Sequence, residues 1–266
     1  MREKNISEDR KKYLGKIKKE KISVILTQIL IVVIFIVGWE ILANKGIIDS
    51  FITSQPSRIL DTFLNLSSNG LLEHLGVTLT ETLIGFILGV VLGVFIAILL
   101  WWSRFLSRVS EPFLVVLNSL PKVALGPILI IWVGAGMQSI IVMALLISTI
   151  ITIINVYQGF TNIDPIKIKL MKTFKATKSQ IYFKLILPGT LSNIISCFKV
   201  NISMSLIGVI MGEFLVSKEG IGYLIMYGSQ VFNLDLVITG TIILCIVAVI
   251  MYGLVLYLEK KLIVNK

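Results

Sequence analysis

Histidine, cysteine and charged residues are all scarce in this chain. Its one histidine, His74, and its two distant cysteines, Cys197 and Cys245, provide no cluster of metal ligands. Both cysteines lie inside apolar runs, which indicates no disulfide framework. No base accompanies a serine or cysteine nucleophile in those runs. We therefore predict neither a metal site nor a catalytic site, and we expect His74 to cap a loop or a helix start.

Charged residues make up 15% of the chain, whereas soluble domains carry about 25%. Hydrophobic residues reach 56%, and the mean hydropathy is +0.92. These values exclude a soluble enzyme and predict an integral protein of the cell membrane.

Six apolar stretches are long enough to cross a bilayer, which takes about 20 residues. We therefore predict an all-α integral membrane fold with six transmembrane helices. Pro121, Lys122 and Pro127 interrupt the third span. The predicted spans are residues 24–42, 82–102, 112–133, 139–158, 188–211 and 236–258.

Lysine and arginine are distributed unequally between the loops. Alternate loops and both termini hold 20 of these residues, and the loops on the other side hold 3. Because basic loops stay in the cytoplasm, both termini are predicted to be cytoplasmic. The net charge of +10 then reflects membrane topology, and we expect no nucleic-acid partner.

These spans and charges divide the chain into four parts. Residues 1–21 form a basic cytoplasmic arm, and residues 22–54 form the first span and an outer loop. Residues 55–261 form a five-helix core that includes a cytoplasmic loop at 159–187, and residues 262–266 form a tail.

The second span carries a small residue at every fourth position: Gly85, Gly89, Gly93 and Ala97. This spacing places all four on one helix face, where another backbone can approach closely. We predict a role in helix packing for this face.

The cytoplasmic loop begins with a helix start. Asp164 and Pro165 read as an N-cap followed by proline at the first helical position. Ile166, Leu170 and Phe174 then form an apolar stripe at helical spacing.

A second helix start follows a short turn at Lys175 and Ala176. Thr177 and Gln180 have the spacing of a capping box, and the helix is predicted to end at the proline break at 187–188. The helix pair could lie on the membrane surface or serve as a handle for a cytoplasmic partner.

The loop resembles the cytoplasmic signature of ABC-importer permeases: Glu-Ala-Ala, three residues, Gly, nine residues, an aliphatic residue, one residue, Leu-Pro. The spacing fits without a gap. The matching positions are Lys169, Leu170 and Met171, then Lys175, Leu185, Leu187 and Pro188. Lysine thus replaces both the glutamate and the glycine.

Further segments resemble the nitrate/sulfonate/taurine-type importer permeases, and the similarity extends from about residue 55 to residue 261. They include Leu-Pro-Lys-Val-Ala-Leu-Gly-Pro at 120–127 and Gly-Glu-Phe-Leu at 212–215. The other segments are 55–57, 74–79, 85–93 and 220–225.

The resemblance implies a type I importer permease that forms half of a solute pathway. Its expected partners are a second permease, expected to be another copy, two cytoplasmic ATPases, an extracytoplasmic binding protein and the lipid bilayer. ATP and Mg²⁺ would bind to the ATPase, since this chain has no Gly-rich Lys-Ser/Thr loop. The residues implied in ATPase coupling are Asp164, Pro165, Ile166, Lys169, Leu170, Met171, Phe174, Lys175, Ala176 and Thr177.

Two lysines change the expected coupling chemistry. A left-handed turn would cost Lys175 about 1 kcal/mol or more, unless the turn takes another form. Lys169 reverses the charge of the signature. An ATPase with matching acidic residues, tolerated drift and impaired coupling are all compatible with these changes.

Lys122 and Lys199 lie about 15 Å into their spans if the helices start at the preceding prolines. Neither has an evident carboxylate partner, so both could favour an anionic solute. Alternatively, free carbonyls could accept from Lys122, and Lys199 could extend toward the interface. The predicted pathway residues are Asn118, Ser119, Lys122, Asn155, Lys199 and Asn201.

The solute is expected to be a sulfonate, taurine or nitrate, with bicarbonate or a pyrimidine vitamin precursor as alternatives. A self-sufficient secondary transporter or channel is the competing function. That class would require carboxylates at mid-membrane depth, and the predicted spans hold essentially none.

Overall fold

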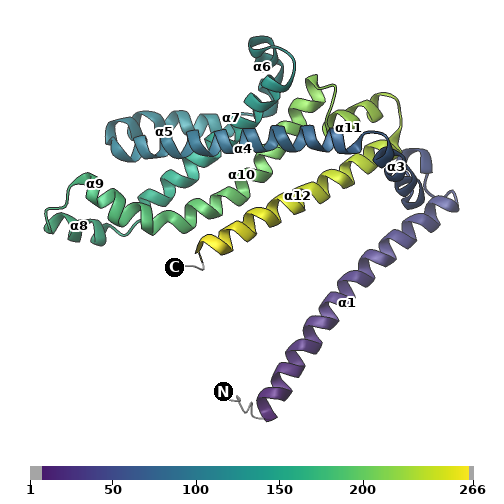
Figure 1. The fold of residues 1–266 in the computed structure, drawn as a ribbon, viewed down its shortest axis with the longest axis horizontal. Coiled ribbons are helices and arrows are strands. Elements are labelled where there is room, and N and C mark those ends of the chain that lie inside the picture. Colours follow the sequence, from purple (N-terminus) through teal and green to yellow (C-terminus); the bar gives the residue numbers. More distant parts are fainter. Residues whose placement is uncertain (1–7, 264–266) are drawn as a thin grey trace. The chain divides into compact units, whose positions relative to one another are not determined.

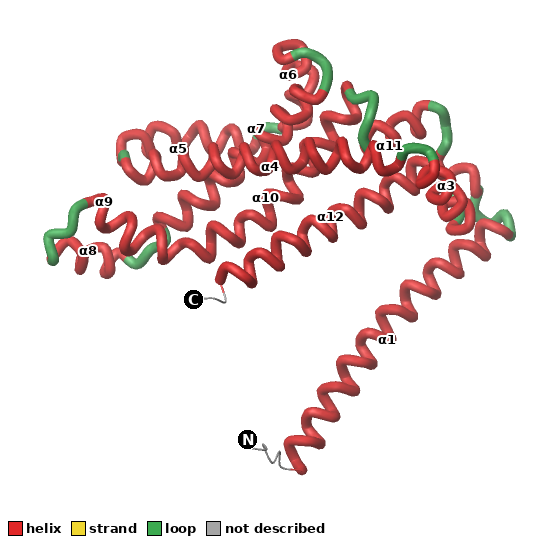
Figure 2. The backbone as a smooth tube through the Cα atoms, in the orientation of Figure 1, coloured by secondary structure: helices red, strands yellow, loops and turns green. Residues whose placement is uncertain are grey.

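The computed structural model describes residues 8–263, which contain helices and turns and no strand (Figure 2). Arg2 and Lys4 of the predicted arm and Lys266 of the predicted tail lie outside the described residues. The chain divides into two compact units, residues 1–63 and 64–266.

The first unit consists mainly of α1 (Glu8–Asn44), which contains the predicted first span. It also holds α2 (Ser50–Thr53) and the first part of α3 (Pro56–Ser68). The Glu40 carboxylate accepts hydrogen bonds from the backbone N–H of Ser57, at 3.0 Å, and from its hydroxyl, at 2.9 Å. These bonds connect the start of α3 to α1.

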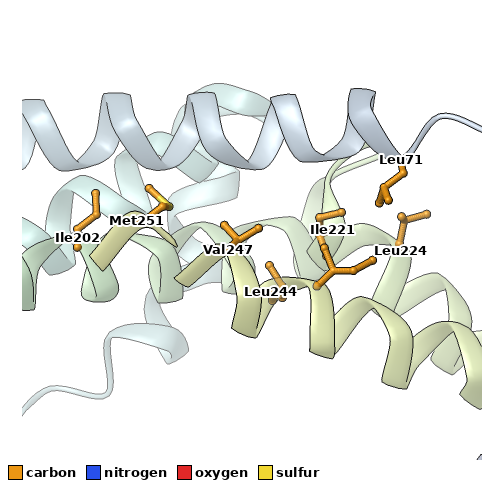
Figure 3. Close-up of a cluster of buried hydrophobic side chains, with 8 residues drawn as sticks. Leu71, Ile202, Ile221, Leu224, Leu244, Val247 and Met251 are labelled. Atoms are coloured by element: carbon orange, nitrogen blue, oxygen red, sulfur yellow. The ribbon is translucent and has the colours of Figure 1, made fainter. Parts of the chain in front are cut away.

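The second unit is built around α7 (Met137–Thr161), which packs against α4 (Leu71–Trp102) and α10 (Leu187–Val216) (Figure 1). Next to α10 lie α11 (Ile221–Gln230) and α12 (Leu234–Ile263). Figure 3 shows the buried cluster that α4, α10, α11 and α12 form together. Its members are Leu71, Ile202, Ile221, Leu224, Ile243, Leu244, Val247 and Met251.

Small residues allow α4 and α7 to approach closely. A β-carbon at Gly85 would lie 2.6 Å from the Cβ of Ala144, and one at Gly89 would lie 2.6 Å from the Cβ of Ser148. One turn further, a β-carbon at Gly93 would lie 2.4 Å from the Cβ of Thr152. Ala97 and Val156 continue this series as fully buried neighbours in one cluster. The predicted small-residue face is therefore the contact face between the two helices.

The third predicted span starts earlier than expected. The structure places its first helix, α5, at Arg104–Ser119, with Pro112 in the helix interior. The Ser103 hydroxyl accepts a hydrogen bond from the N–H of Leu106 and caps the helix start. The predicted start at residue 112 is wrong because this serine cap sets the boundary.

The interruption of the third span is a bend of 90°. Leu120 is extended, as expected for a residue that precedes proline, and Pro121 follows it. The chain continues as a 3₁₀ turn, η1 (Lys122–Leu125), and as α6 (Gly126–Val133).

Within residues 8–263, five helices are long and apolar enough to cross a membrane, and the bent pair brings the number to the predicted six when it counts as one span. The five stretches are Tyr13–Asn44, Leu71–Trp102, Met137–Thr161, Lys178–Val216 and Leu234–Lys261.

The predicted helix break at residues 187–188 is wrong. α9 (Lys178–Ile181), a π-helical turn, η2 (Tyr182–Ile186), and α10 form one continuous helix of 39 residues. The N–H of Leu187 donates to the carbonyl of Tyr182, five residues earlier. This wider turn accommodates Pro188, whose ring cannot fit a regular α-helical turn.

We predict that Gly93→Ala destabilises the protein, although alanine normally stabilises a helix by about 1 kcal/mol relative to glycine. The added β-carbon would overlap Thr152, and such overpacking costs about 1–3 kcal/mol. Thermal unfolding of the purified chain, followed by fluorescence-detected size exclusion, measures the effect.

The matched control is Gly253→Ala in α12, since no neighbouring heavy atom lies within 4 Å of a β-carbon there. This control should keep or raise the melting temperature. A Gly93→Ala protein as stable as the control would contradict the close contact between α4 and α7.

Candidate functional site

The cytoplasmic loop contains a short helix, α8 (Pro165–Thr173), with a defined start. Asp164 Oδ1 accepts a hydrogen bond from the N–H of Ile166 at 2.8 Å, and Pro165 occupies the first turn. The following turn ends in a complete capping box, in which the Thr177 hydroxyl and the Gln180 side chain each accept from the other's backbone N–H. Both predicted helix starts are confirmed.

The apolar stripe of α8 points away from the rest of the second unit. Ile166, Leu170 and Phe174 are 73%, 56% and 74% exposed. Ile168 and Met171, on the other face, pack against a buried cluster. An amphipathic helix normally buries its apolar face, so α8 has one apolar face inside the protein and a second one available to a partner.

An aromatic cluster fixes this loop to the ends of α4 and α7. The Tyr182 ring lies 5.2 Å from the ring of Trp101, 6.1 Å from that of Trp102 and 5.7 Å from that of Phe160. The Lys178 ammonium donates to the Trp102 carbonyl and lies over both indole rings. The loop that contains α8 is therefore in contact with the ends of α4 and α7.

Lys175 takes the left-handed conformation that the signature glycine would adopt, with φ at +56°. Its N–H donates to the carbonyl of Lys172, and the N–H of Ala176 donates to that of Met171. These bonds close α8 in the manner of a helix C-cap. Lys169 and Lys175 are both exposed.

The structure brings two of the predicted pathway residues together. Asn118 and Ser119, at the end of α5, line a cavity of about 410 Å³ with Glu111, Tyr157 and Gln158. Glu111 lies one residue before the predicted third span and reaches this cavity because α5 already starts at Arg104, whereas Tyr157 and Gln158 come from α7. Lys122, Asn155, Lys199 and Asn201 do not line it.

Lys122 donates to the carbonyl of Asn118 at 3.0 Å. The proline at 121 leaves backbone carbonyls of the preceding helical turn without an N–H partner, and Lys122 uses one of them, as the alternative prediction expected. Asn155 accepts through its carbonyl from the Asn193 side chain. Asn201 is fully buried, accepts from Ser148 and donates to Cys197, so it connects α7 and α10.

The expectation that Lys199 lacks a carboxylate partner is wrong. Its ammonium lies 2.8 Å from Oε2 of Glu259 on α12, and Glu259 Oε1 accepts from Ser196. Because the helix begins at Lys178 and ends at Val216, Lys199 lies about 25 Å from its outer end. The assumed helix start at Pro188 is wrong, because the helix already begins at Lys178.

At the other end of α10, a buried carboxylate organises the start of α11. Glu213 is 1% exposed and accepts from the Thr78 hydroxyl and from the N–H of Gly222, each at 2.6 Å. Thr78 in turn accepts from the N–H of Ile221 at 2.9 Å. A β-carbon at Gly220 or Gly222 would lie within 2.6 Å of the carboxylate, so glycine is required at both positions.

His74 Nδ1 accepts from the N–H of Gly220 at 3.0 Å, directly before α11. The predicted capping role of His74 is confirmed. The glycines at 212, 220 and 222 around Glu213 were a visible signal for this network, but nothing in the sequence pattern pairs Glu213 with Thr78.

These features define a helical, multi-pass membrane protein that presents a short amphipathic helix outside its transmembrane bundle. A model of the family described as "binding-protein-dependent transport system inner membrane component" matches residues 89–264. The chain belongs to this family of ABC transporter permeases, which are membrane components and not catalytic subunits.

The relatives include a probable ABC transporter permease protein of Haemophilus influenzae, 30% identical, in an alignment that covers 86% of this chain and 93% of the relative. A putative aliphatic sulfonates transport permease of Bacillus subtilis is 28% identical, in an alignment that covers 88% of this chain and 85% of the relative. A formylaminopyrimidine transport permease of Halalkalibacterium halodurans is 28% identical, in an alignment that covers 70% of this chain and 74% of the relative.

Among solved structures, the fold resembles a chain of the MetNI methionine ABC transporter in an inward-facing conformation. The TM-score is 0.61 at 20% identity, over 72% of this chain and 94% of the other. The fold is therefore that of type I importer permeases, as predicted.

We predict that Lys175→Gly slows hydrogen exchange of the backbone amides between α8 and α9. Glycine removes the strain of a left-handed lysine, which amounts to about 1 kcal/mol, equivalent to about a fivefold change in exchange. Hydrogen–deuterium exchange with mass spectrometry measures the effect.

Lys175→Ala separates the backbone effect from the effect of charge, since it removes the ammonium and keeps the strain. If the alanine variant protects these amides as well as the glycine variant does, the strain argument fails.

Proposed function

We propose that this chain forms half of a solute pathway that a separate ATPase drives through α8. Two permease chains, two cytoplasmic ATPase subunits and an extracytoplasmic binding protein would form the complete importer. The second permease chain would be another copy of this one.

The observation that carries this proposal is the double-faced packing of α8. One face contacts the cluster around Tyr182, and the other exposes Ile166, Leu170 and Phe174. A helix of this kind can rest in a groove of a partner by its apolar side chains. A movement of the partner would then displace the ends of α4 and α7 through the aromatic cluster.

The hydrogen bonds at both ends of α8 also support the proposal. A lever must keep its shape under load, and the Asp164 cap and the Thr177–Gln180 capping box hold the two turns on either side of α8. The exposed lysines around the stripe suit a partner with acidic residues near its groove.

The solute class has less support than the coupling role. The ion pair of Lys199 and the hydrogen bond of Lys122 weaken the argument that free cations select an anion. The relatives' names include both sulfonates and formylaminopyrimidine. A small sulfonate, taurine or nitrate remains a proposal that rests on resemblance.

We predict that Leu170→Ala releases the ATPase without unfolding the chain. Leu170 is exposed, so its truncation removes partner contacts while costing little stability, and a central apolar anchor is worth about 2 kcal/mol or more. Co-purification from cells that express the complete transporter should fall about tenfold or more. Lys172→Ala, on the same helix but away from the stripe, is the control.

Equal ATPase retention by the Leu170→Ala and Lys172→Ala proteins would argue against α8 as the coupling element. A permease that accumulates solute without any ATPase would instead support the secondary transporter or channel.

We also predict that Lys169→Glu lowers permease-stimulated ATP hydrolysis, because it places a carboxylate where an acidic partner residue is expected. A compensating acid-to-lysine change on the ATPase should restore the rate. Unchanged assembly and hydrolysis in the single variant would favour tolerated drift at this position.

A further inference from the structure

A second, larger cavity lies at the opposite end of α4 from the aromatic cluster. It has a volume of about 670 Å³, within the range of small-ligand pockets. The segment before α7 and the segment after α10 complete its wall. The lining residues are Leu72, Glu73, Gly76, Val77, Thr80, Glu81, Ala135, Gly136, Met137, Val216, Ser217, Lys218 and Glu219.

Carboxylates dominate the charges of this cavity. Glu73, Glu81 and Glu219 line it, and Lys218 is the one cation among its described lining residues. Glu73, Lys218 and Glu219 are exposed, whereas Glu81 is only 1% exposed. Glu81 therefore belongs to the inner wall, where water does not screen its charge.

Glu81 has an unsatisfied oxygen atom. Its Oε2 atom is buried and has no hydrogen-bond partner among the described residues. A buried, unpartnered carboxylate oxygen is costly in a folded protein and calls for an explanation.

The neighbouring Glu213 does not satisfy this atom. The carboxyl groups of Glu81 and Glu213 are in hydrogen-bonding contact, which requires one shared proton. Glu213 also accepts from Thr78 and Gly222, so its role is to hold the start of α11. The acceptor left without a partner is Oε2 of Glu81.

We propose that this cavity binds a protonated amine or amidine group of the transported solute, with Oε2 of Glu81 as the acceptor. The inference rests on the proposed function as a permease and narrows the proposed solutes to compounds with a cationic nitrogen group, of which taurine is one. An N–H⁺ donor would satisfy the orphaned oxygen through a charge-assisted hydrogen bond.

The size of the cavity and its mixed lining fit such a solute. Leu72, Val77, Met137 and Val216 provide an apolar wall for a small ring or chain. Glu73 and Glu219 at the exposed part of the cavity would attract a cation before it reaches Glu81.

The test uses the full chain in complex with its ATPase, reconstituted in lipid nanodiscs, and a hydrophobic carbodiimide that modifies buried protonated carboxyl groups. Peptide mass spectrometry locates the adduct. Two pairs of probes each differ in one amino group: taurine and isethionate, and 4-amino-2-methylpyrimidine and 2-methylpyrimidine.

We expect a carbodiimide adduct on Glu81. At least one amine-bearing probe should protect Glu81 at a concentration about tenfold or more below that of its amine-free counterpart, as expected for a charge-assisted hydrogen bond. Glu81→Gln should remove the adduct, while Glu20→Gln, on α1 and outside the cavity lining, should retain both adduct and protection.

The proposal is overturned if both members of each probe pair protect Glu81 equally, or if no probe protects it. A carbodiimide adduct on Glu213 alone also overturns it. Protection by the binding protein but by no amine-bearing probe also overturns it, because a protein side chain would then be the occupant. If the ATPase stays bound to the chain but no amine-bearing probe protects Glu81, only the solute proposal fails. If the ATPase does not stay bound to the chain, the proposed coupling function fails whatever the probes do.

Discussion

The close approach of α4, α7 and α10 is the constraint on which the rest of the second unit depends. Within a bilayer, apolar side chains gain little from leaving lipid, so helix association relies on packing and on polar contacts between helices. Gly85, Gly89 and Gly93 bring α4 against α7, and Gly208 of α10 meets the backbone of Ala144, the residue that Gly85 also contacts. The buried Asn201 adds a hydrogen bond between α7 and α10.

This packed group of helices connects two regions with different chemistry. At one end, Trp101, Trp102 and Tyr182 hold the coupling loop with α8. At the other end, Thr78 and Glu213 hold the start of α11 beside the acidic cavity. Helices that pack without room for a single methyl group transmit displacement as a unit. In the proposed function, these packed helices would connect an ATPase at α8 with a solute at the cavity.

Much of this arrangement could be predicted from local sequence. The capping box at Thr177 and the Asp164–Pro165 helix start depend on neighbouring residues, and both are present. The spacing of the glycines in the second span was enough to identify a packing face. The sequence left two forms of the turn at Lys175 open, and the structure shows the left-handed one.

The errors concern contacts between residues far apart in the chain. The helix that carries Lys199 starts before Pro188, because a π-helical turn accommodates the proline and extends the helix. Its partner Glu259 lies 60 residues later, and no periodicity relates the two. Likewise, Glu81 and Glu213 come together only through the packing of α4 against α10. Local patterns determine caps and faces, whereas charge pairing in the membrane requires the tertiary structure.

The central claim is that this chain moves solute only when a separate ATPase acts on it. Solute accumulation in proteoliposomes tests it most directly, with vesicles that contain the chain alone or the complete set of chain, ATPase and binding protein. The account predicts that solute accumulates only in vesicles that contain all three components, and only when the ATPase is supplied with hydrolysable ATP. Accumulation against a gradient by the chain alone would contradict it.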